Sequence, residues 1–283
     1  MENIEEILYP SPPFHNATLW LGTGTTFRSR LKNEFMKALF LDIDGVLQPC
    51  GRQERFAHID EIPSLCKQLN ETVKTDFDYE AYVGDSYSNA CDIGAVYFDW
   101  DKPSVERLRR ILDMTGARVI LSSNWREGGM KRMKGFMAIY NLDSYLDDMT
   151  YCILDEQRYN LENAKATQAS IEAWRDILQM LHKRFSELYP ADPDKWFDGV
   201  DYRAIEIREY LDRHPEITSF VALDDRNIGK GLDGHFIHTR NFILEEDVQQ
   251  CIEILNREDG PFPLDATLHT PELEEWRKKY VQI

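Results

Sequence analysis

The stretch Lys37–Gln48, KALFLDIDGVLQ, decides the fold of this chain. An uninterrupted apolar run, 38–41, leads directly into Asp42-Ile43-Asp44-Gly45. A run of this kind is typical of a strand that is buried on both faces. Side chains alternate along a strand, so Asp42 and Asp44 are expected to point the same way. The stretch therefore predicts a central strand with two carboxylates at its carboxyl end, where open α/β sheets bind ligands.

Two further apolar runs of strand type also end in polar residues. Ala117–Leu121 stops at Ser122-Ser123-Asn124, and Ser219–Leu223 meets Asp224-Asp225. A helix predicted from Asp101-Lys102-Pro103 to Gly116 precedes the first of these runs, and a strand-helix-strand order indicates a right-handed parallel crossover. Because parallel strands end at one edge of a sheet, all these polar groups are expected near Asp42. The predicted fold class is α/β, a Rossmann-like three-layer parallel sheet with a helical insertion.

The rest of the chain is divided by composition. Residues 1–36 are interpreted as an N-terminal extension and 37–283 as the core. The core is interrupted at 50–100 by a loop or cap insertion and at 142–199 by a helical insertion, in which Asn160–Tyr189 has near-helical apolar spacing. A longer crossover connection is an equally good interpretation of 142–199. Three more elements are predicted: a helix over Asp201–Arg213, a strand over His235–Thr239 and a helix over Leu244–Leu255.

Composition and charge limit the classes of partner. The chain has 283 residues, is 42% hydrophobic and carries a formal net charge of -17. Such a charge opposes binding to long nucleic acids, which are held mainly by Lys and Arg. No apolar run approaches the length of a membrane span, and the acidic start MENIEEILYP lacks the pattern of a secretory signal. The five cysteines suggest neither a disulfide framework nor a zinc site, so a cytoplasmic, reducing compartment is expected.

The acids at the ends of the predicted strands indicate a metal site. Asp42, Asp44, Asp224 and Asp225 would repel one another unless a cation lay among them. An all-oxygen cluster favours Mg²⁺, which is often completed by substrate phosphate. A hydroxyl and a nearby cationic side chain would hold the remaining phosphate oxygens. A carboxylate can also act as the nucleophile, and a second acid can serve as general acid and base.

With these motifs the chain resembles the haloacid dehalogenase (HAD) superfamily of phosphatases. The first motif, DxDGV, is Asp42 to Val46; the second is VILSSN, ending at Asn124; the fourth is FVALDD, ending at Asp225. The third motif is a Lys or Arg ahead of the last strand, here Arg203 or, alternatively, Lys195. The surrounding text, LSSNWRE and RAIEIREYL, also shows a weaker likeness to HAD domains associated with nucleic-acid end repair.

The resemblance implies a role for each of these residues. Asp42 would be the nucleophile and Asp44 the acid/base, and an Asp at this second position indicates phosphatase chemistry. Phosphate would be bound by Ser123 or Ser122, by Asn124 and by Arg203. Mg²⁺ would be held by Asp42, Asp224, Asp225 and the backbone carbonyl of Asp44. The expected activity is hydrolysis of a phosphomonoester belonging to a nucleotide or nucleic-acid end, a phosphoprotein or a small metabolite. The alternative is a catalytically silent module that keeps the fold for binding or regulation.

Several of these residues also have a purely structural interpretation. Ser122 and Ser123 are suited to capping a strand or turn, and Arg203 to a helix surface. Trp125 and Arg126 either line the pocket or, in the simpler interpretation, are a packing tryptophan and a solvated arginine.

Overall fold

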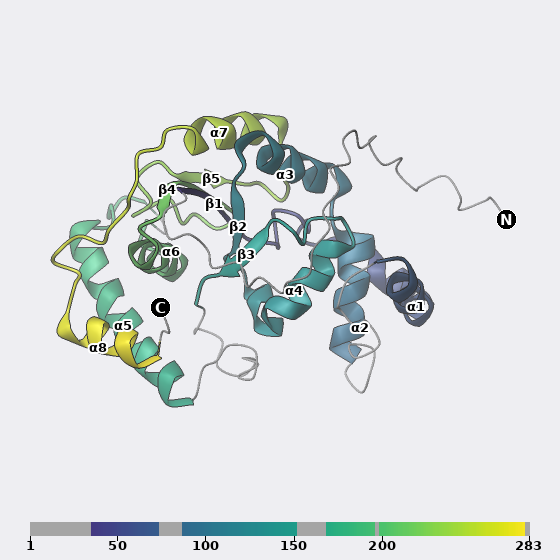
Figure 1. The fold of residues 1–283 in the computed structure, drawn as a ribbon, viewed down its shortest axis with the longest axis horizontal. Helices are drawn as coiled ribbons and strands as arrows, with labels where there is room; N and C mark the ends of the chain where they lie inside the picture. The colour runs from purple at the N-terminus through teal and green to yellow at the C-terminus, as the bar shows by residue number, and fades with distance from the viewer. Residues whose placement is uncertain (1–34, 74–86, 152–167, 196–197, 281–283) are drawn as a thin grey trace, which may run out of the picture. The chain divides into compact units, whose positions relative to one another are not determined.

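The computed structural model describes residues 35–73, 87–151, 168–195 and 198–280. These residues build one five-stranded sheet with strand order β3-β2-β1-β4-β5, in which every neighbouring pair is parallel (Figure 1). The strands are β1 (Met36–Leu41), β2 (Arg118–Leu121), β3 (Leu146–Met149), β4 (Ile217–Asp224) and β5 (Phe236–His238). The strand predicted from KALFL is therefore the middle one, and the α/β class with a Rossmann-like sheet is confirmed.

Helices cover both faces of this sheet (Figure 1). One face is covered by α3 (Lys102–Thr115), α4 (Gly129–Ala138) and α7 (Glu245–Leu255), and the other by α5 (Gln168–Leu188), α6 (Tyr202–Arg213) and α8 (Pro271–Tyr280). The helix α1 (Ile62–Thr72) lies to the side of the sheet, beyond α4 (Figure 1). The remaining elements are α2 (Tyr87–Gly94), two 3-10 segments, η2 (Glu54–Glu61) and η5 (Asn124–Gly128), and one π-helical turn, η4 (Ala95–Asp99). The arrangement has the three layers that the sequence predicted.

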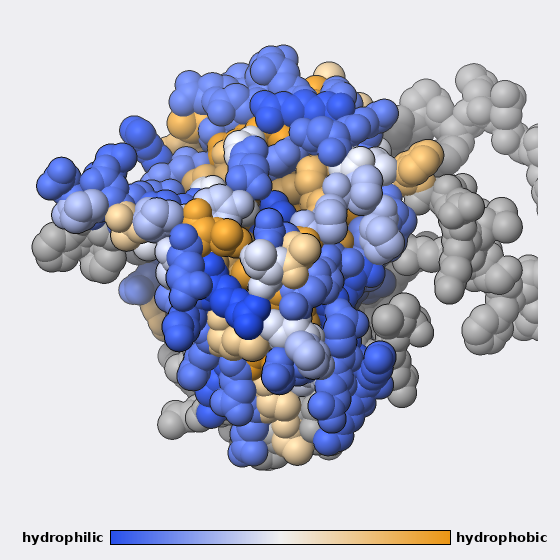
Figure 2. All heavy atoms as spheres, turned by 90° about the vertical axis from the view of Figure 1, so that its left-hand side faces the viewer, coloured by the Kyte–Doolittle hydropathy of each residue, from blue (hydrophilic) through white to orange (hydrophobic). Residues whose placement is uncertain are grey.

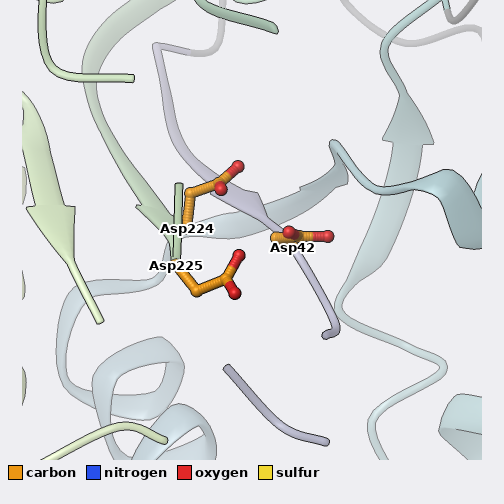
Figure 3. Close-up of side chains that lie close together, drawn as sticks. All are labelled: Asp42, Asp224 and Asp225. Carbon is orange, nitrogen blue, oxygen red and sulfur yellow. The ribbon is translucent and has the colours of Figure 1, made fainter. Parts of the chain in front are cut away.

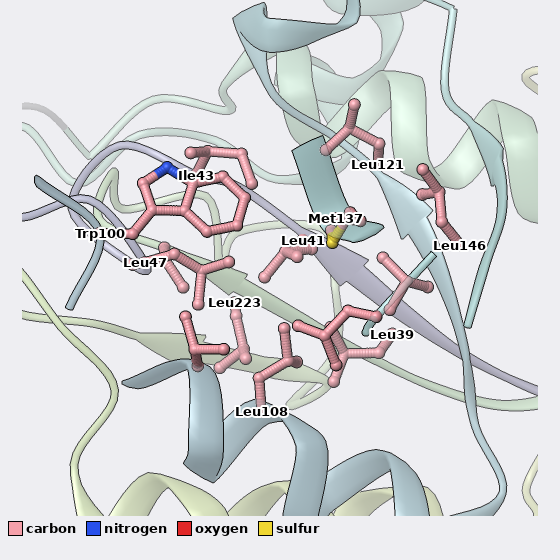
Figure 4. Packing of buried hydrophobic residues seen from close by; sticks show 14 of the residues in the cluster. Leu39, Leu41, Ile43, Leu47, Trp100, Leu108, Leu121, Met137, Leu146 and Leu223 are labelled. Atoms are coloured by element: carbon pink, nitrogen blue, oxygen red, sulfur yellow. The ribbon is translucent and has the colours of Figure 1, made fainter. Parts of the chain in front are cut away.

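Alternation along β1 separates the two hydrophobic cores. Leu39 and Leu41 face one core, together with Leu108 of α3 (Figure 4). Ala38 and Phe40 face the other core, which is filled from α5, α6 and α8. All four of these β1 side chains are completely buried. A shift of β1 by one residue would move the side chains of each core to the opposite face of the sheet. Because both faces are packed, the position of Asp42 at the end of the strand is well determined.

The crossover from β1 to β2 follows the sequence prediction. Asp101 caps α3 by accepting a hydrogen bond from the Ser104 backbone N–H at 2.9 Å. Gly116 ends the helix in the left-handed conformation, with φ of 70°. These are the residue types that start and stop helices.

One expectation about the sheet is wrong. The segment 142–199 was expected to be a helical insertion outside the sheet, but Leu146–Met149 forms the edge strand β3 and pairs with β2. Its sequence, LDDM, has no apolar run because an edge strand that is only partly covered needs few buried side chains. The long helix expected over Asn160–Tyr189 is present as α5, Gln168–Leu188, and residues 152–167 lie outside the described residues.

The segment 50–100 was expected to be mainly irregular, with one or two short helices. In its described part, 3-10, α and π turns follow one another through η2, α1, α2 and η4. Residues 74–86 of this segment lie outside the described residues, as does nearly all of the expected N-terminal extension 1–36, of which only 35 and 36 are described.

The face on the side of α5 and α8 is mostly hydrophilic, with small and separate apolar areas (Figure 2). Among the helices of the described residues, none combines the length and the apolar character of a membrane span.

Candidate active site

Three carboxylates converge at the carboxyl end of the two middle strands (Figure 3). Asp42 directly follows β1, Asp224 is the last residue of β4, and Asp225 follows it. One carboxylate oxygen from each of the three lies within 4.8 Å of the other two. Asp42 and Asp224 are only 4% and 1% exposed, so their charges are largely removed from water. Ionised carboxylates at such positions require a compensating cation.

The register of the sheet produces this convergence. Leu41 of β1 lies opposite Leu223 of β4, so the residues that follow them, Asp42 and Asp224, are neighbours. The backbone N–H of Asp42 donates to the Leu223 carbonyl at 3.0 Å. On the other side, the Ser122 N–H donates to the Leu41 carbonyl at 2.8 Å. The ends of β1, β2 and β4 are thus held together by backbone hydrogen bonds.

Arg203 supplies a cation to two of the acids. Its Nη1 lies 2.6 Å from Oδ2 of Asp42 and 2.7 Å from Oδ2 of Asp224, and all three side chains are buried. Its Nη2 donates to Oδ1 of Asn124 at 3.3 Å. The position of Arg203 follows from its place in the first turn of α6, where its backbone N–H donates to the Asp201 cap at 2.8 Å.

Lys195, the alternative for the third motif, lies elsewhere. Its side chain is 69% exposed and pairs with Asp192 at 3.2 Å. The structure therefore brings Arg203, and not Lys195, to the carboxylate group. The interpretation of Arg203 as a surface helix residue is wrong, because it is 4% exposed.

One guanidinium does not compensate three carboxylates. Burial, and after it the charge of Asp42, raises the pKa of Asp224 to about 7, although Arg203 opposes the shift. The remaining negative charge and the all-oxygen ligand set fit a small divalent cation such as Mg²⁺. Asp42, Asp224 and Asp225 are the side chains that would hold it.

Asp44 is held apart from this group by two donors. Trp125 Nε1 donates to its Oδ2 at 3.1 Å, and Gln48 Nε2 donates to its Oδ1 at 3.2 Å. Burial, and after it the charge of Asp42, raises the pKa of the Asp44 carboxyl above its ordinary value. A raised pKa makes a carboxyl group better suited to act as a general acid.

Ser122, Ser123 and Asn124 follow β2 at the same edge of the sheet. Ser123 is completely buried, and its Oγ caps the η5 segment by accepting from the Trp125 N–H at 3.4 Å. The Ser122 Oγ is buried without a hydrogen-bond partner among the described residues. Asn124 is exposed and contacts Arg203. Ser123 therefore has the capping role that the structural interpretation predicted. Phosphate binding by the hydroxyls of Ser122 and Ser123 stays a prediction.

Gly45 permits the close approach of Asp225. Its φ of +70° lies in the left-handed region, and a Cβ at this position would come within 2.4 Å of the Asp225 side chain. Only glycine combines this backbone conformation with this contact. The glycine of the DxDG motif is therefore required at this site for two separate reasons, its positive φ and its close contact with Asp225.

Two contacts of the site were not predicted from the sequence. Arg126, for which a solvated position was expected, is buried and pairs with Glu206 of α6 at 3.1 Å. Trp125 contacts the acid Asp44 in addition to packing in the core. Arg126 and Glu206 are 80 positions apart in the sequence, so their contact could not be predicted from local pattern. The available signal was that Trp125 and Arg126 follow shortly after the predicted strand end at Leu121.

The chain was also compared with known proteins. A family model described as "HAD domain in Swiss Army Knife RNA repair proteins" matches residues 38–244. This range contains β2 to β5, all of β1 except its first two residues, and every residue of the site described above. The chain matches no curated protein and no solved structure.

Proposed function

We propose that this chain, which belongs to the family of HAD domains in Swiss Army Knife RNA repair proteins, hydrolyses phosphate monoesters through a covalent phosphate on Asp42. The HAD domain indicates a phosphatase-type hydrolase in general. The covalent intermediate, the dependence on Mg²⁺ and the substrate belong to the proposal. The observation that carries it is the position of Asp42, which pairs with the Arg203 guanidinium and lies within 4.8 Å of Asp224 and Asp225, two acids that could share a metal ion with it.

The reaction proposed for these residues has two steps. In the first, a carboxylate oxygen of Asp42 forms a bond to phosphorus while the bond to the leaving oxygen breaks, and Asp44 gives its proton to that oxygen. In the second, Asp44 takes a proton from water as the water attacks the phosphorus, inorganic phosphate leaves, and the carboxylate of Asp42 is restored. The same carboxyl group thus serves as acid and then as base.

The other side chains bind and compensate charge. Arg203 already donates to Asp42 and Asp224, so a phosphate at Asp42 would meet a guanidinium in position to take its oxygens. The hydroxyls of Ser122 and Ser123 would donate to the remaining phosphate oxygens. Mg²⁺, held by Asp42, Asp224 and Asp225, would neutralise the charge that phosphate brings to a site already rich in carboxylates.

The substrate we propose is a phosphate at the end of an RNA strand. The family description names RNA repair, and this is the observation that favours nucleic-acid ends over phosphoproteins and small metabolites. The net charge of -17 would repel the rest of the strand, so recognition is expected to be confined to the terminal phosphate and the nucleotides next to it. Turnover should then fall little on addition of salt, because few phosphates are neutralised by the protein.

A substrate screen tests the proposal. Wild type and Asp42→Asn are incubated with Mg²⁺ and, separately, with 5′- and 3′-phosphorylated oligoribonucleotides, a phosphopeptide, a sugar phosphate and p-nitrophenyl phosphate. We expect release of phosphate from the oligoribonucleotides and the aryl phosphate by wild type only. Equal rates for the two proteins would reject Asp42 as the nucleophile. Absence of turnover on every substrate would favour the alternative, a silent HAD-fold binding or regulatory module.

A further inference from the structure

We propose that Trp125, with Gln48 as a second donor, is a positioning residue that fixes the carboxyl group of Asp44 for proton transfer to the leaving group. This role rests on the proposed phosphatase reaction and adds to it. Trp125 would contact neither substrate nor metal in this role. It would act through Asp44 alone.

The contacts of Asp44 carry the inference. Each of its two carboxylate oxygens has one donor, Trp125 Nε1 at 3.1 Å and Gln48 Nε2 at 3.2 Å. Asp44 lies beyond the end of β1, in a turn where its backbone forms an isolated bridge with Gln48. Because no strand or helix orients this side chain, the two hydrogen bonds are what sets the direction of the carboxyl group.

The indole of Trp125 is itself held in place. Its ring packs edge to face against Trp100, with centroids 6.1 Å apart, and against Phe136, with centroids 5.8 Å apart. Its backbone N–H donates to Ser123 Oγ at 3.4 Å. A ring fixed by two aromatic neighbours presents its N–H in one direction only. Trp125, the residue that follows the SSN of the second motif, therefore connects that motif to Asp44, the acid of the first motif.

Such positioning has a kinetic consequence that depends on the leaving group. A general acid contributes only when it lies within hydrogen-bond reach of the oxygen that it protonates, and small displacements are costly. A poor leaving group such as phenolate needs that proton, whereas p-nitrophenolate is more stable as an anion and needs it less. Loss of Asp44 positioning should therefore slow the formation of the phosphoenzyme more for phenyl phosphate than for p-nitrophenyl phosphate.

The test compares kcat/KM for these two esters, which are alike in shape, in wild type and Trp125→Phe. The value of kcat/KM reports the step in which the ester bond breaks, and the phenyl ring preserves the aromatic packing while removing the N–H. We expect kcat/KM for phenyl phosphate to fall by about tenfold more than kcat/KM for p-nitrophenyl phosphate. An equal fall for both esters, or no fall, would overturn the role of Trp125.

A matched control separates positioning from packing. Trp174 is completely buried in the core on the other face of the sheet, and its Nε1 has no hydrogen-bond partner among the described residues. Trp174→Phe should change kcat/KM for both esters by the same factor, and a leaving-group effect in this variant as well would overturn the inference.

A second variant covers the case in which Trp125→Phe does not fold, as judged by circular dichroism. Gln48→Met removes the other donor to Asp44 and should show the same leaving-group effect. If this variant shows no leaving-group effect, the inference is overturned. If wild type hydrolyses neither these esters nor the phosphorylated oligoribonucleotides, the phosphatase function itself is rejected, which is a different result from the loss of the Trp125 effect alone.

Discussion

Arg203 and Asp42, 161 positions apart in the chain, form a buried ion pair in which Nη1 lies 2.6 Å from Oδ2. The same nitrogen lies 2.7 Å from Oδ2 of Asp224, so one guanidinium joins the ends of β1 and β4. Because Arg203 is the second residue of α6, this helix is thereby tied to the carboxyl edge of the sheet.

Replacing this cation is expected to affect stability and activity together. Arg203→Met leaves two buried carboxylates without their cationic partner, and breaking a buried ion pair in this way costs roughly 3–5 kcal/mol of unfolding free energy. Urea denaturation without divalent cations measures the loss, and the phosphatase assay should show no turnover. Lys195→Met is the control, since its side chain is 69% exposed, and it should change neither quantity. The reverse result would transfer the phosphate-binding role to Lys195.

Removing a metal ligand should reduce the effect of Mg²⁺ on stability. A ligand that binds only the folded state stabilises it by about 2.7 kcal/mol at one hundred times its Kd. Thermal melting of wild type should therefore shift upward with added MgCl₂, and Asp224→Asn should need a much higher concentration for the same shift. Asp233→Asn is a matched control, because Asp233 is exposed and pairs with Arg208 away from the three acids. Equal Mg²⁺ responses in all three proteins would contradict the metal site.

At Gly45, the effect of the backbone conformation on stability can be separated from the effect of the close contact with Asp225 by a comparison with Gly51. Gly45→Ala adds a Cβ that would lie 2.4 Å from the Asp225 side chain, at a φ of +70°. Gly51 has a similar φ of +85° but nothing within 4 Å of an added Cβ. Gly51→Ala should therefore cost only the backbone strain, about 1–2 kcal/mol, and keep its Mg²⁺-dependent activity. Gly45→Ala should be less stable than this and lose activity, as measured by urea denaturation and phosphate release.

The buried pair of Arg126 and Glu206 predicts a dependence of stability on pH. Burial raises the pKa of Glu206, and Arg126 opposes the shift, so Arg126→Met should raise that pKa further. A carboxyl group whose pKa is raised by folding contributes most at low pH, and its contribution is lost as pH rises through the folded value. The destabilisation by Arg126→Met should thus be about 3–5 kcal/mol at pH 8 and smaller at pH 5.

The double variant Arg126→Met with Glu206→Gln is the control for this prediction. It lacks the titrating group, so its stability relative to wild type should change much less between pH 5 and pH 8. An equal deficit for Arg126→Met at both pH values would show that the Glu206 carboxyl is not the source of the loss.

The parts of the fold that were predicted correctly are those with strong local signals. The apolar run before Asp42 can only be buried on both sides, and the Asp101 cap and Gly116 stop mark α3 directly. Once β1, β2 and β4 are parallel, the acids and hydroxyls at their ends must meet. The resemblance to HAD phosphatases rested on the same strand ends.

The features that were missed depend on contacts between distant segments. The edge strand Leu146–Met149 buries a single side chain, so its apolar pattern is too weak to indicate a strand. Trp125 lies 81 positions from Asp44, and nothing in the intervening sequence indicates that its N–H turns toward that carboxyl. Arg126 was expected in solvent because arginine is mostly exposed, and its burial follows only from the presence of Glu206 on α6.

The central place of β1 in the sheet has a consequence for how such an enzyme diversifies. The acids are carried by the ends of the interior strands β1 and β4, whereas η2, α1, α2 and η4 lie between β1 and α3 and add no strand to the sheet. Changes confined to these four elements would leave the strand ends that carry the acids in place. A new substrate preference therefore requires no new chemistry, only different surroundings at the mouth of an unchanged reaction centre.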